Sequence, residues 1–333
     1  MIQPLRIPFV VFLAAISASV AAAQANVRYY RYALSLRSQE TTYSVEVPEG
    51  AHGHHFEVET DAQGRIVRAA SIRYGQKEGE ILYHFAGDSK LADGYETYRA
   101  GEKTGRTEIQ RNAHGDWVRA DSFTVAGTRT GYTVYSYGPD SVEVTSYMAD
   151  GKPTQVWINS YSAKGTLTGG IEYPNPVDGG FHVDVNYDES TGLKKTRRQI
   201  RDGNVENSGT FTYDADGEEI RQDAFNASGQ WFAAGEYRDG LVTRRLYHFG
   251  KELHYAYDDQ RRLKETKLLL NDALVCRFVY ERLADGTVKR TLALGPDGTL
   301  WAEYPDQEIW EVDNFGQPIS GKSVVMHKAG RWY

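Results

Sequence analysis

Cysteine is nearly absent from this sequence, because Cys276 is the only one among 333 residues. A single thiol cannot form an internal disulfide, so no covalent cross-link stabilises the fold. Cys276 stands at an apolar position of the alternating stretch 274–278, and free cysteines in such positions are commonly buried. The sequence therefore predicts a core thiol and excludes a disulfide-stabilised scaffold.

An excess of basic residues is also lacking. The chain has 38 Lys and Arg against 45 Asp and Glu, which gives a net charge of −7. Proteins that bind nucleic acid need a clustered basic face to neutralise phosphates. We therefore expect no nucleic-acid partner.

The motifs of common catalytic and cofactor sites are lacking as well. The sequence has no Gly-x-Ser-x-Gly, no His-Glu-x-x-His and no glycine-rich phosphate loop. The acidic stretch 214–219 fails as an EF-hand, because Glu219 occupies the place of the sharp-turn glycine. Neighbouring acids such as Asp258 and Asp259 point apart or lie in solvated turns, unlike a glycosidase pair. We expect no cofactor, and a non-catalytic protein is favoured over an enzyme.

Long apolar runs are confined to the N-terminus. Arg6 precedes an apolar stretch over 7–20, and the small residues of 21–25 offer a signal-peptidase site. The stretch of about 14 residues is shorter than the roughly 20 that a membrane-spanning helix requires. The sequence predicts a cleaved signal peptide over 1–25, export to the periplasm or beyond the cell, and no membrane span in the mature chain.

Tyrosine, in contrast, is abundant and evenly spaced. Eight of the 23 tyrosines return at intervals of 20 to 26 residues, namely Tyr137, Tyr161, Tyr187, Tyr213, Tyr237, Tyr257, Tyr280 and Tyr304. A period of this length is typical of an array of like supersecondary units. In-phase tyrosines are most simply the packed interior of such an array, with each hydroxyl bonded to a local partner.

Each unit of about 24 residues reads as two strands and two turns. Phe211 and Tyr213 alternate into the turn 214–217, and Asp-Gly pairs at other turns suit the positive φ of tight hairpins. No sustained helical period occurs after the signal peptide. The sequence predicts an all-β fold, an antiparallel β-hairpin repeat array. About 20 strands exceed a flat open sheet, so we expect a spiral, a partly closed shell or packed sheets.

The chain divides into segments of different regularity. We expect a less regular β-repeat region over 26–130, the regular hairpin repeats over 131–305, and a C-terminal cap over 306–333, because terminal units of arrays are usually atypical. Two prolines in the stretch 173–180 cannot occupy a central strand and predict a protruding loop.

Three turns carry a family resemblance. Tyr-Asp-Glu-Ser-Thr-Gly-Leu at 187–193, Tyr-Asp-Ala-Asp-Gly at 213–217 and Tyr-Asp-Asp-Gln-Arg-Arg-Leu at 257–263 resemble degenerate YD repeats of the RHS family. That unit reads Tyr-Asp-x-x-Gly-Arg followed by an apolar residue; here Arg261 replaces the glycine in the third copy. The resemblance implies a β-hairpin array on an exported protein, and similar exported repeat proteins are linked to surface binding, including of carbohydrate.

The histidines near residue 54 are candidate metal ligands. Alternation along a strand places His52 and His54 on the side of Phe56 and places His55 on the other side. Two imidazoles on one strand need a third ligand, for which His84 and His114 are candidates. The alternative is a polar loop that leads into an edge strand.

The tryptophans are candidate ligand-binding residues. Trp117, Trp310 and Trp332 fall outside the regular strand pattern and are expected at the surface, where exposed rings can stack on sugars. Three others stand within repeat strands and are expected in the core: Trp157, Trp231 and Trp301.

Together these patterns favour an exported, non-catalytic binding or structural β-repeat protein of the bacterial envelope or surface. The expected partner is a glycan or another envelope protein, and the oligomeric state is open. Two alternatives remain: an envelope enzyme acting on a polysaccharide, and a toxin-neutralising repeat protein.

Overall fold

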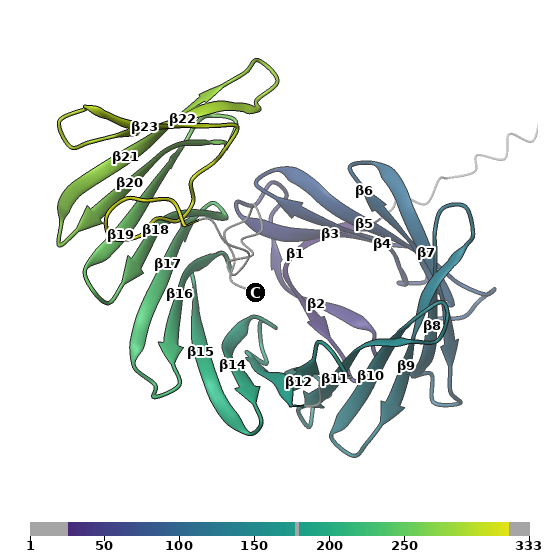
Figure 1. Cartoon of the computed structure of the whole chain (residues 1–333). Coiled ribbons are helices and arrows are strands. Elements are labelled where there is room, and N and C mark those ends of the chain that lie inside the picture. Colours follow the sequence, from purple (N-terminus) through teal and green to yellow (C-terminus); the bar gives the residue numbers. More distant parts are fainter. Residues whose placement is uncertain (1–25, 177–179, 320–333) are drawn as a thin grey trace, which may run out of the picture.

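The computed structural model describes residues 26–176 and 180–319. The predicted signal peptide over 1–25 lies outside these residues. The described chain forms 23 strands in one antiparallel sheet, so the prediction of an all-β hairpin array is confirmed (Figure 1). In the described ranges no helix is long and apolar enough to span a membrane.

The strands are short and follow one another through tight turns. Their bounds are β1 Asn26–Ser35, β2 Thr41–Val47, β3 His54–Thr60, β4 Ile66–Arg73, β5 Gln76–His84, β6 Gly94–Arg99, β7 Glu102–Arg111, β8 Trp117–Phe123, β9 Arg129–Tyr137, β10 Ser141–Met148, β11 Pro153–Tyr161, β12 Leu167–Tyr173, β13 Phe181–Tyr187, β14 Lys194–Arg201, β15 Asn204–Tyr213, β16 Glu219–Asn226, β17 Trp231–Arg238, β18 Leu241–Tyr247, β19 Lys251–Tyr257, β20 Leu263–Leu270, β21 Ala273–Arg282, β22 Val288–Leu294 and β23 Leu300–Pro305.

The sheet is a meander with one exception at its start. From β3 to β23 each strand pairs antiparallel with the next, whereas β1 lies between β2 and β3. The ladder continues across residue 130 through the β8–β9 and β9–β10 pairs. Strands β12 and β13 also pair on either side of the proline-containing loop, part of which (177–179) lies outside the described residues.

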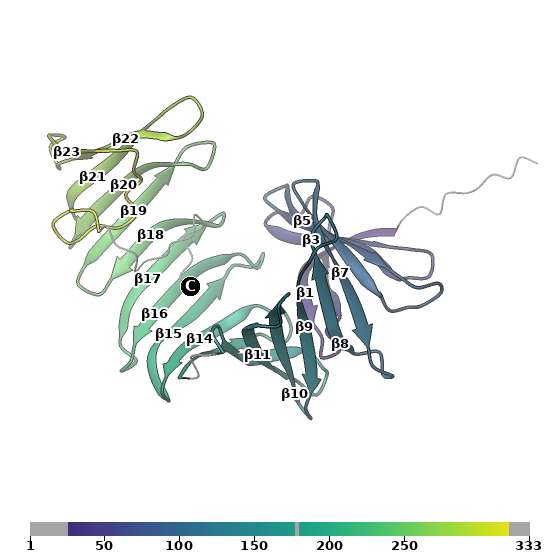
Figure 2. The ribbon, with the colours of Figure 1, turned by 45° about the vertical axis from the view of Figure 1, so that its right-hand side comes forward.

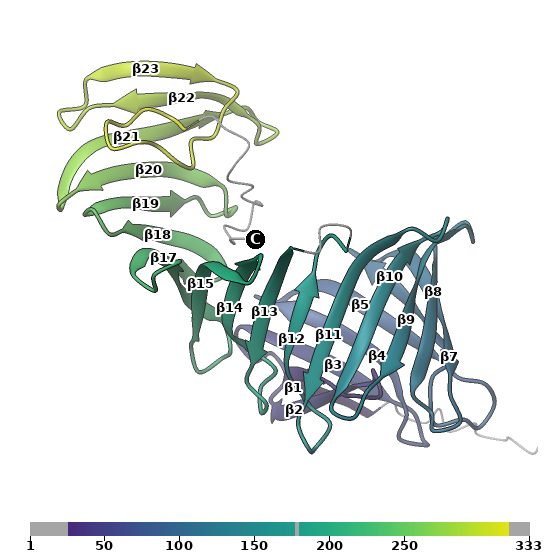
Figure 3. The ribbon, with the colours of Figure 1, turned by 60° about the horizontal axis from the view of Figure 1, so that its bottom comes forward.

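The twist of successive strands curls the sheet into a spiral (Figures 1 and 2). Strands β1–β12 make the first coil, and Figure 3 shows β13–β23 continuing away from it. The first coil closes on itself where Leu36 forms an isolated bridge with Thr166 and the Arg37 N–H donates to Gly165 O at 2.8 Å. This closure is a contact between turns, and the ladder itself continues into β13.

The aspartate of each of the three Tyr-Asp turns organises its hairpin. Asp214 Oδ1 accepts hydrogen bonds from the N–H groups of Asp216 and Glu218, both at 2.9 Å. Gly217 then adopts φ 77°, which a residue with a Cβ reaches only with strain. Arg261 occupies the same turn position in a later repeat and is held at φ 62°. The Asp and the Gly of the repeat are therefore explained by turn chemistry.

Three of the eight repeated tyrosines join their hairpin to the preceding one. A tyrosine hydroxyl donates to a backbone carbonyl that lies 15 to 20 residues earlier in three cases: Tyr137 to Trp117 (2.8 Å), Tyr213 to Lys194 (2.9 Å) and Tyr257 to Val242 (2.8 Å). Each accepting carbonyl lies at or next to the start of a strand. This contact gives a physical reason for the period of about 24 residues.

Arginine takes over the same role where tyrosine is missing. Arg111 Nη2 donates to Ala92 O at 2.6 Å, and Arg282 Nη2 donates to Leu263 O at 2.8 Å. Both arginines stand just before a turn, as the tyrosines do. The repeat therefore extends through turns in which the sequence shows no Tyr-Asp pair.

The two faces of the sheet differ in chemistry. The inner, concave face carries the apolar core, in which Leu253, Leu268 and Phe278 are fully buried. The outer face carries ion pairs between neighbouring strands; Arg68, for example, lies 2.6 Å from Glu57 and 2.9 Å from Glu80. Alternation along each strand thus separates core residues from solvated charges.

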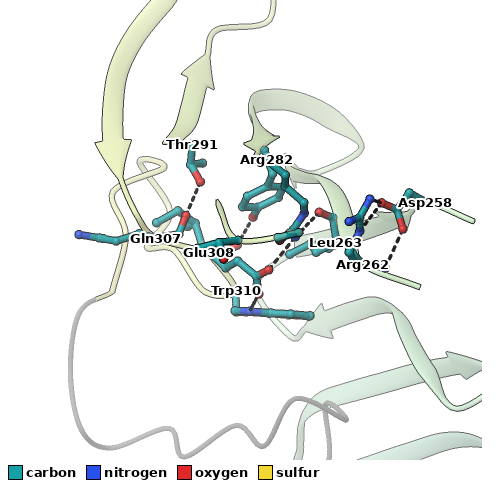
Figure 4. A network of polar contacts seen from close by, with 12 residues as sticks. Asp258, Arg262, Leu263, Arg282, Thr291, Gln307, Glu308 and Trp310 are labelled. Carbon is teal, nitrogen blue, oxygen red and sulfur yellow. Dashed lines mark hydrogen bonds and ion pairs between the residues drawn. The ribbon is translucent and has the colours of Figure 1, made fainter. Parts of the chain in front are cut away.

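After β23 the chain folds back across the inner face of β18–β22. Ile309 and Val312 of this return segment, residues 306–319, are 4% and 0% exposed within the core. Tyr280 donates to Ile309 O at 2.6 Å, and Arg282 Nη2 lies 2.6 Å from Glu308 Oε1, as Figure 4 shows for the surrounding network. The described part of the expected cap covers a face of the sheet rather than its terminal strand.

Candidate functional site

A cavity of about 560 Å³ opens on the inner face of β11–β16, beside the ends of β3 and β4. Its aromatic lining comes from three strands: Trp157, Tyr187, Phe211 and Tyr213. Its charged and titratable lining is contributed by seven residues: His54, Arg73, Glu172, Lys194, Arg197, Glu218 and Glu219. Aromatic rings beside a few polar groups are typical of small-molecule sites.

The inner face carries three small residues, Gly170, Gly209 and Ala224, in one row beside the cavity. The strand register places Gly170, Val185, Arg197, Gly209 and Ala224 side by side in one row from β12 to β16. A Cβ on Gly209 would approach Asp223 O at 3.1 Å, so a larger residue is disfavoured there. Elsewhere in the first coil, the rings of Tyr95, Trp117 and Tyr135 pack together on this face.

Glu172 stands at the side of the cavity formed by β12. It lies directly opposite Trp157 in the strand register, and its Oε1 accepts a hydrogen bond from Gln155 Nε2 at 2.6 Å. Burial raises the pKa of the nearby Tyr187 hydroxyl, and the Glu172 charge adds to this effect. The carboxylate and the indole therefore present a polar and an apolar group from neighbouring strands.

Arg197 lies on β14, on the same face. Burial lowers the pKa of its guanidinium, and the charge of Glu172 opposes that shift. The neighbouring Lys194 ammonium lies 5.4 Å from the centre of the Phe211 ring, a cation–π contact. Cationic and aromatic side chains thus alternate along this wall of the cavity.

Glu218 closes the cavity at the seam between the first coil and the later hairpins. It is 8% exposed, and its Oε2 accepts a hydrogen bond from the Tyr74 hydroxyl at 2.9 Å. Arg73 Nη1 lies 3.8 Å from the same oxygen. Glu218 Oε1 is buried and has no hydrogen-bond donor among the described residues. The β4–β5 and β15–β16 turns therefore build this wall together.

The seam is extended by a second set of contacts. Arg31, 7% exposed, donates to the carbonyls of His52 and His54 at 2.7 and 2.9 Å and lies 3.0 Å from Asp216 Oδ1. Asp216 belongs to the same β15–β16 turn as Glu218. The loop before β3 is thus fixed to a turn that lies far away in the sequence.

The histidines predicted as metal ligands lie in three different settings. His54 lines the cavity, with its Nε2 2.9 Å from Ser71 Oγ, and burial lowers its pKa. His55 is buried on the opposite face of β3, and His52 is exposed. His84 and His114 are also exposed. Among the described residues, no three His, Cys, Asp or Glu side chains are grouped as a metal site.

The tryptophans differ from their expected positions. Trp117 is 9% exposed, its indole N–H donates to Glu40 Oε1 at 2.7 Å, and Tyr135 packs on it at 6.0 Å between ring centres. The expected surface position of Trp117 is therefore corrected to a core position on the inner face. Trp301, expected in the core, is 49% exposed because β23 is the terminal strand.

The other two candidate tryptophans belong to the C-terminal segment. Trp310 is partly buried; its ring lies 5.7 Å from that of Tyr255, and its indole N–H donates to Glu308 at 3.1 Å (Figure 4). Trp332 lies outside the described residues. Of the residues that line the cavity, the sequence singles out only His54 as a candidate site residue, and it predicts a core position for Trp157.

One sequence signal could have located the cavity. Gly170 and Gly209 stand inside strands, where glycine marks a close backbone approach or an unfilled face. The β13–β14 register pairs Arg197 with the inner-facing Val185, so Arg197 lies on the same face as Val183 and Val185. Alternation alone could not show that Arg197 faces a cavity, because the opposing wall comes from β3 and β4.

Comparisons with known proteins describe the fold only distantly. No family model and no curated protein matches the chain. The crystal structure of TcdB2-TccC3 is similar at 12% identity and a TM-score of 0.30, over 80% of this chain and 19% of that chain. A porin-like protein from Bacteroides uniformis ATCC 8492 is similar at 10% identity and a TM-score of 0.33, over 65% and 92%.

A second porin-like protein, from Bacteroides vulgatus ATCC 8482, has 10% identity and a TM-score of 0.14, over 82% of this chain and 96% of that chain. The chain spans less than a fifth of the length of the TcdB2-TccC3 chain described above. None of these likenesses bears on the function.

Proposed function

We propose that this is an exported, non-catalytic binding protein of the bacterial envelope or surface, built from RHS-type YD repeats, and that it recognises a glycan. The binding site is the inner-face cavity of β11–β16. The observation that carries the proposal is the lining of this cavity, where Trp157, Tyr187 and Phe211 lie among carboxylate, guanidinium and amide groups. The apolar sequence over 7–20 supports export.

This lining suits a sugar on physical grounds. The C–H face of a pyranose ring packs on an aromatic ring, while its hydroxyls donate to carboxylates and accept from guanidinium or amide N–H groups. Trp157 and Glu172 stand side by side in the register and offer both kinds of contact. A cavity of about 560 Å³ is also within the range of pockets that hold small ligands.

A glycan array tests the proposal with the mature protein from Asn26. We expect selective binding to one glycan class, with and without EDTA. Trp157→Ala should weaken binding at least about 10-fold, because a buried aromatic contact is lost. Trp301→Ala is the matched control, since Trp301 is exposed on β23, remote from the cavity lining.

Two outcomes would contradict the proposal. A silent array would reject a glycan ligand and favour a protein partner, to be sought by pull-down from an envelope extract. Equal binding by the wild type and the Trp157→Ala variant would place the glycan elsewhere on the molecule.

A second candidate function is hydrolysis or another reaction of a polysaccharide. It is favoured by one observation: Glu172, Glu218 and Glu219 line the same cavity, and glycosidases require two acids across a cleft. Release of new reducing ends from a bound polysaccharide, abolished in Glu172→Gln or Glu218→Gln, would replace the non-catalytic proposal. Binding without release supports the proposal as stated.

A further inference from the structure

Arg197 differs from the other cations that line the cavity. Arg73 is paired with Glu78 at 3.3 Å and lies 3.8 Å from Glu218, and Lys194 contacts the Phe211 ring. For Arg197, the described ranges show no hydrogen bond and no ion pair within 4.0 Å. Its guanidinium nevertheless lies on the inner face, among the cavity-lining residues.

The surroundings of Arg197 leave room for a ligand. Its direct neighbours in the register are Val185 on β13 and Gly209 on β15, and neither can accept a hydrogen bond through a side chain. Tyr187 and Phe211 stand two residues further along these strands, on the same face. A partly buried cation between apolar neighbours favours an anion that replaces the lost hydration.

We propose that the cavity is specific for an acidic oligosaccharide, and that Arg197 binds the carboxylate of a uronic-acid unit through paired N–H donors. The proposal rests on the glycan-binding function proposed above and names the class of glycan. A carboxylate matches the planar guanidinium, which presents two parallel donors to two oxygens.

The other charges of the cavity favour a carboxylate over a phosphate. Glu172 is the acidic group whose charge acts most directly on Arg197, and Glu218 and Glu219 line the same space. Three acids repel a dianion more strongly than a monoanion. The sugar hydroxyls that accompany a uronate can in turn donate hydrogen bonds to these carboxylates.

The spacing of the strands indicates an oligosaccharide rather than a single sugar. Trp157 lies on β11 and Arg197 lies on β14, three strand spacings apart. That separation is about 14 Å across the sheet, which one pyranose ring cannot span. A chain of several units can place a uronate at Arg197 while another unit packs on Trp157.

Titration calorimetry on the mature protein tests this inference. The probes are trisaccharides of galacturonate, glucuronate and mannuronate, the methyl esters of these trisaccharides, and neutral maltotriose and cellotriose. We expect at least one free acid to bind 10-fold or more tightly than its own ester. Added salt should weaken the binding of the acid and leave that of the ester unchanged.

Variants of Arg197 locate the effect. Arg197→Gln should weaken binding of the acid about 10- to 100-fold, the usual range for a lost charge-assisted hydrogen bond. Arg197→Lys should recover part of the loss. Arg198→Gln is the matched control, because Arg198 is 53% exposed and pairs with Asp184 on the outer face at 3.0 Å.

Each of the remaining outcomes would contradict one part of the proposal: acid specificity, glycan binding or the role of Arg197. Neutral sugars or esters that bind as well as the acids reject acid specificity and leave glycan binding intact. A lack of binding by every probe rejects both acid specificity and glycan binding. Equal losses of affinity in Arg197→Gln and Arg198→Gln reject the role of Arg197. Should the Arg197 variants fail to fold, the comparison of acid with ester on the wild type still decides.

Discussion

Glu311 is the acidic residue that holds the C-terminal return segment on the sheet. Its carboxylate accepts hydrogen bonds from Tyr247 at 2.6 Å and from Lys251 at 2.8 Å, and Arg245 Nη1 lies 3.3 Å away. Arg245 and Lys251 are 1% and 7% exposed. Two buried cations thus share this carboxylate, and removal of one partner from such a group is costly.

Glu311→Ala is therefore expected to destabilise the protein strongly. Loss of one partner from a buried charge group costs about 3–5 kcal/mol, and a urea unfolding curve measures the change. Glu308→Gln is the control, because Glu308 pairs with Arg282 but is 31% exposed. A Glu311 variant no less stable than the Glu308 variant would show that the return segment is not held by this contact.

Two hairpin turns with the same backbone geometry differ in whether they pack against a distant part of the chain. Gly64 and Gly217 close equivalent turns with φ 75° and 77°. A Cβ on Gly64 would meet nothing within 4 Å, whereas a Cβ on Gly217 would lie 2.8 Å from the Tyr32 ring. The first turn is exposed, and the second docks on the first coil.

These two glycines form a matched pair for mutation. Gly64→Ala should cost about 1–2 kcal/mol, from the left-handed backbone alone. Gly217→Ala should cost clearly more, because the new methyl group also displaces Tyr32 at the seam. Urea unfolding of both variants measures the difference; equal losses would mean that the β15–β16 turn does not pack on β1 in solution.

The presence of the strands could be predicted from the sequence, but the exposure of individual side chains such as Trp117 and Trp301 could not. Alternation and Asp-Gly turns are local signals, and they identified the hairpins and the all-β fold correctly. Trp117 and Trp301 were misplaced because exposure depends on which strands are neighbours and which strand ends the sheet. The strand that covers a residue cannot be read from the residue's own segment.

Buried tyrosines give the whole molecule a common pH response. Burial raises the pKa of Tyr43 from 10.0 to about 12. It also raises, above the ordinary value, the pKa of four others: Tyr83, Tyr135, Tyr247 and Tyr280. Each hydroxyl is then harder to ionise in the folded state than in the unfolded state, where its pKa is about 10.

The free energy of unfolding should therefore fall with rising pH. A raised folded pKa contributes stability that is fully present below pH 10 and is lost progressively through the window from about 10 to 12. Tyrosinate absorbance and circular dichroism, followed together in an alkaline titration, measure this. Tyrosinate signal that rises fully near pH 10, with the sheet intact, would contradict the burial of these hydroxyls.

The local structure follows from the sequence alone: the hairpin units, their turns and their period of about 24 residues. Alternating side chains, Asp-capped turns and the tyrosine bonds between neighbouring hairpins all act within some 25 residues, so a single chain segment contains the relevant information. The resemblance of three turns to YD repeats has the same origin, because Asp214 and Gly217 serve the turn.

The cavity, in contrast, arises from contacts between segments that are distant in the sequence. Arg31 and Asp216 meet across 185 residues of sequence, and Tyr74 and Glu218 meet across 144. Such contacts depend on the twist accumulated over about a dozen strands. A pattern within one segment cannot predict that accumulated twist. The same coiling carries His54 of β3 to the cavity that Trp157 and Arg197 line, and so creates the site from residues of distant chain segments.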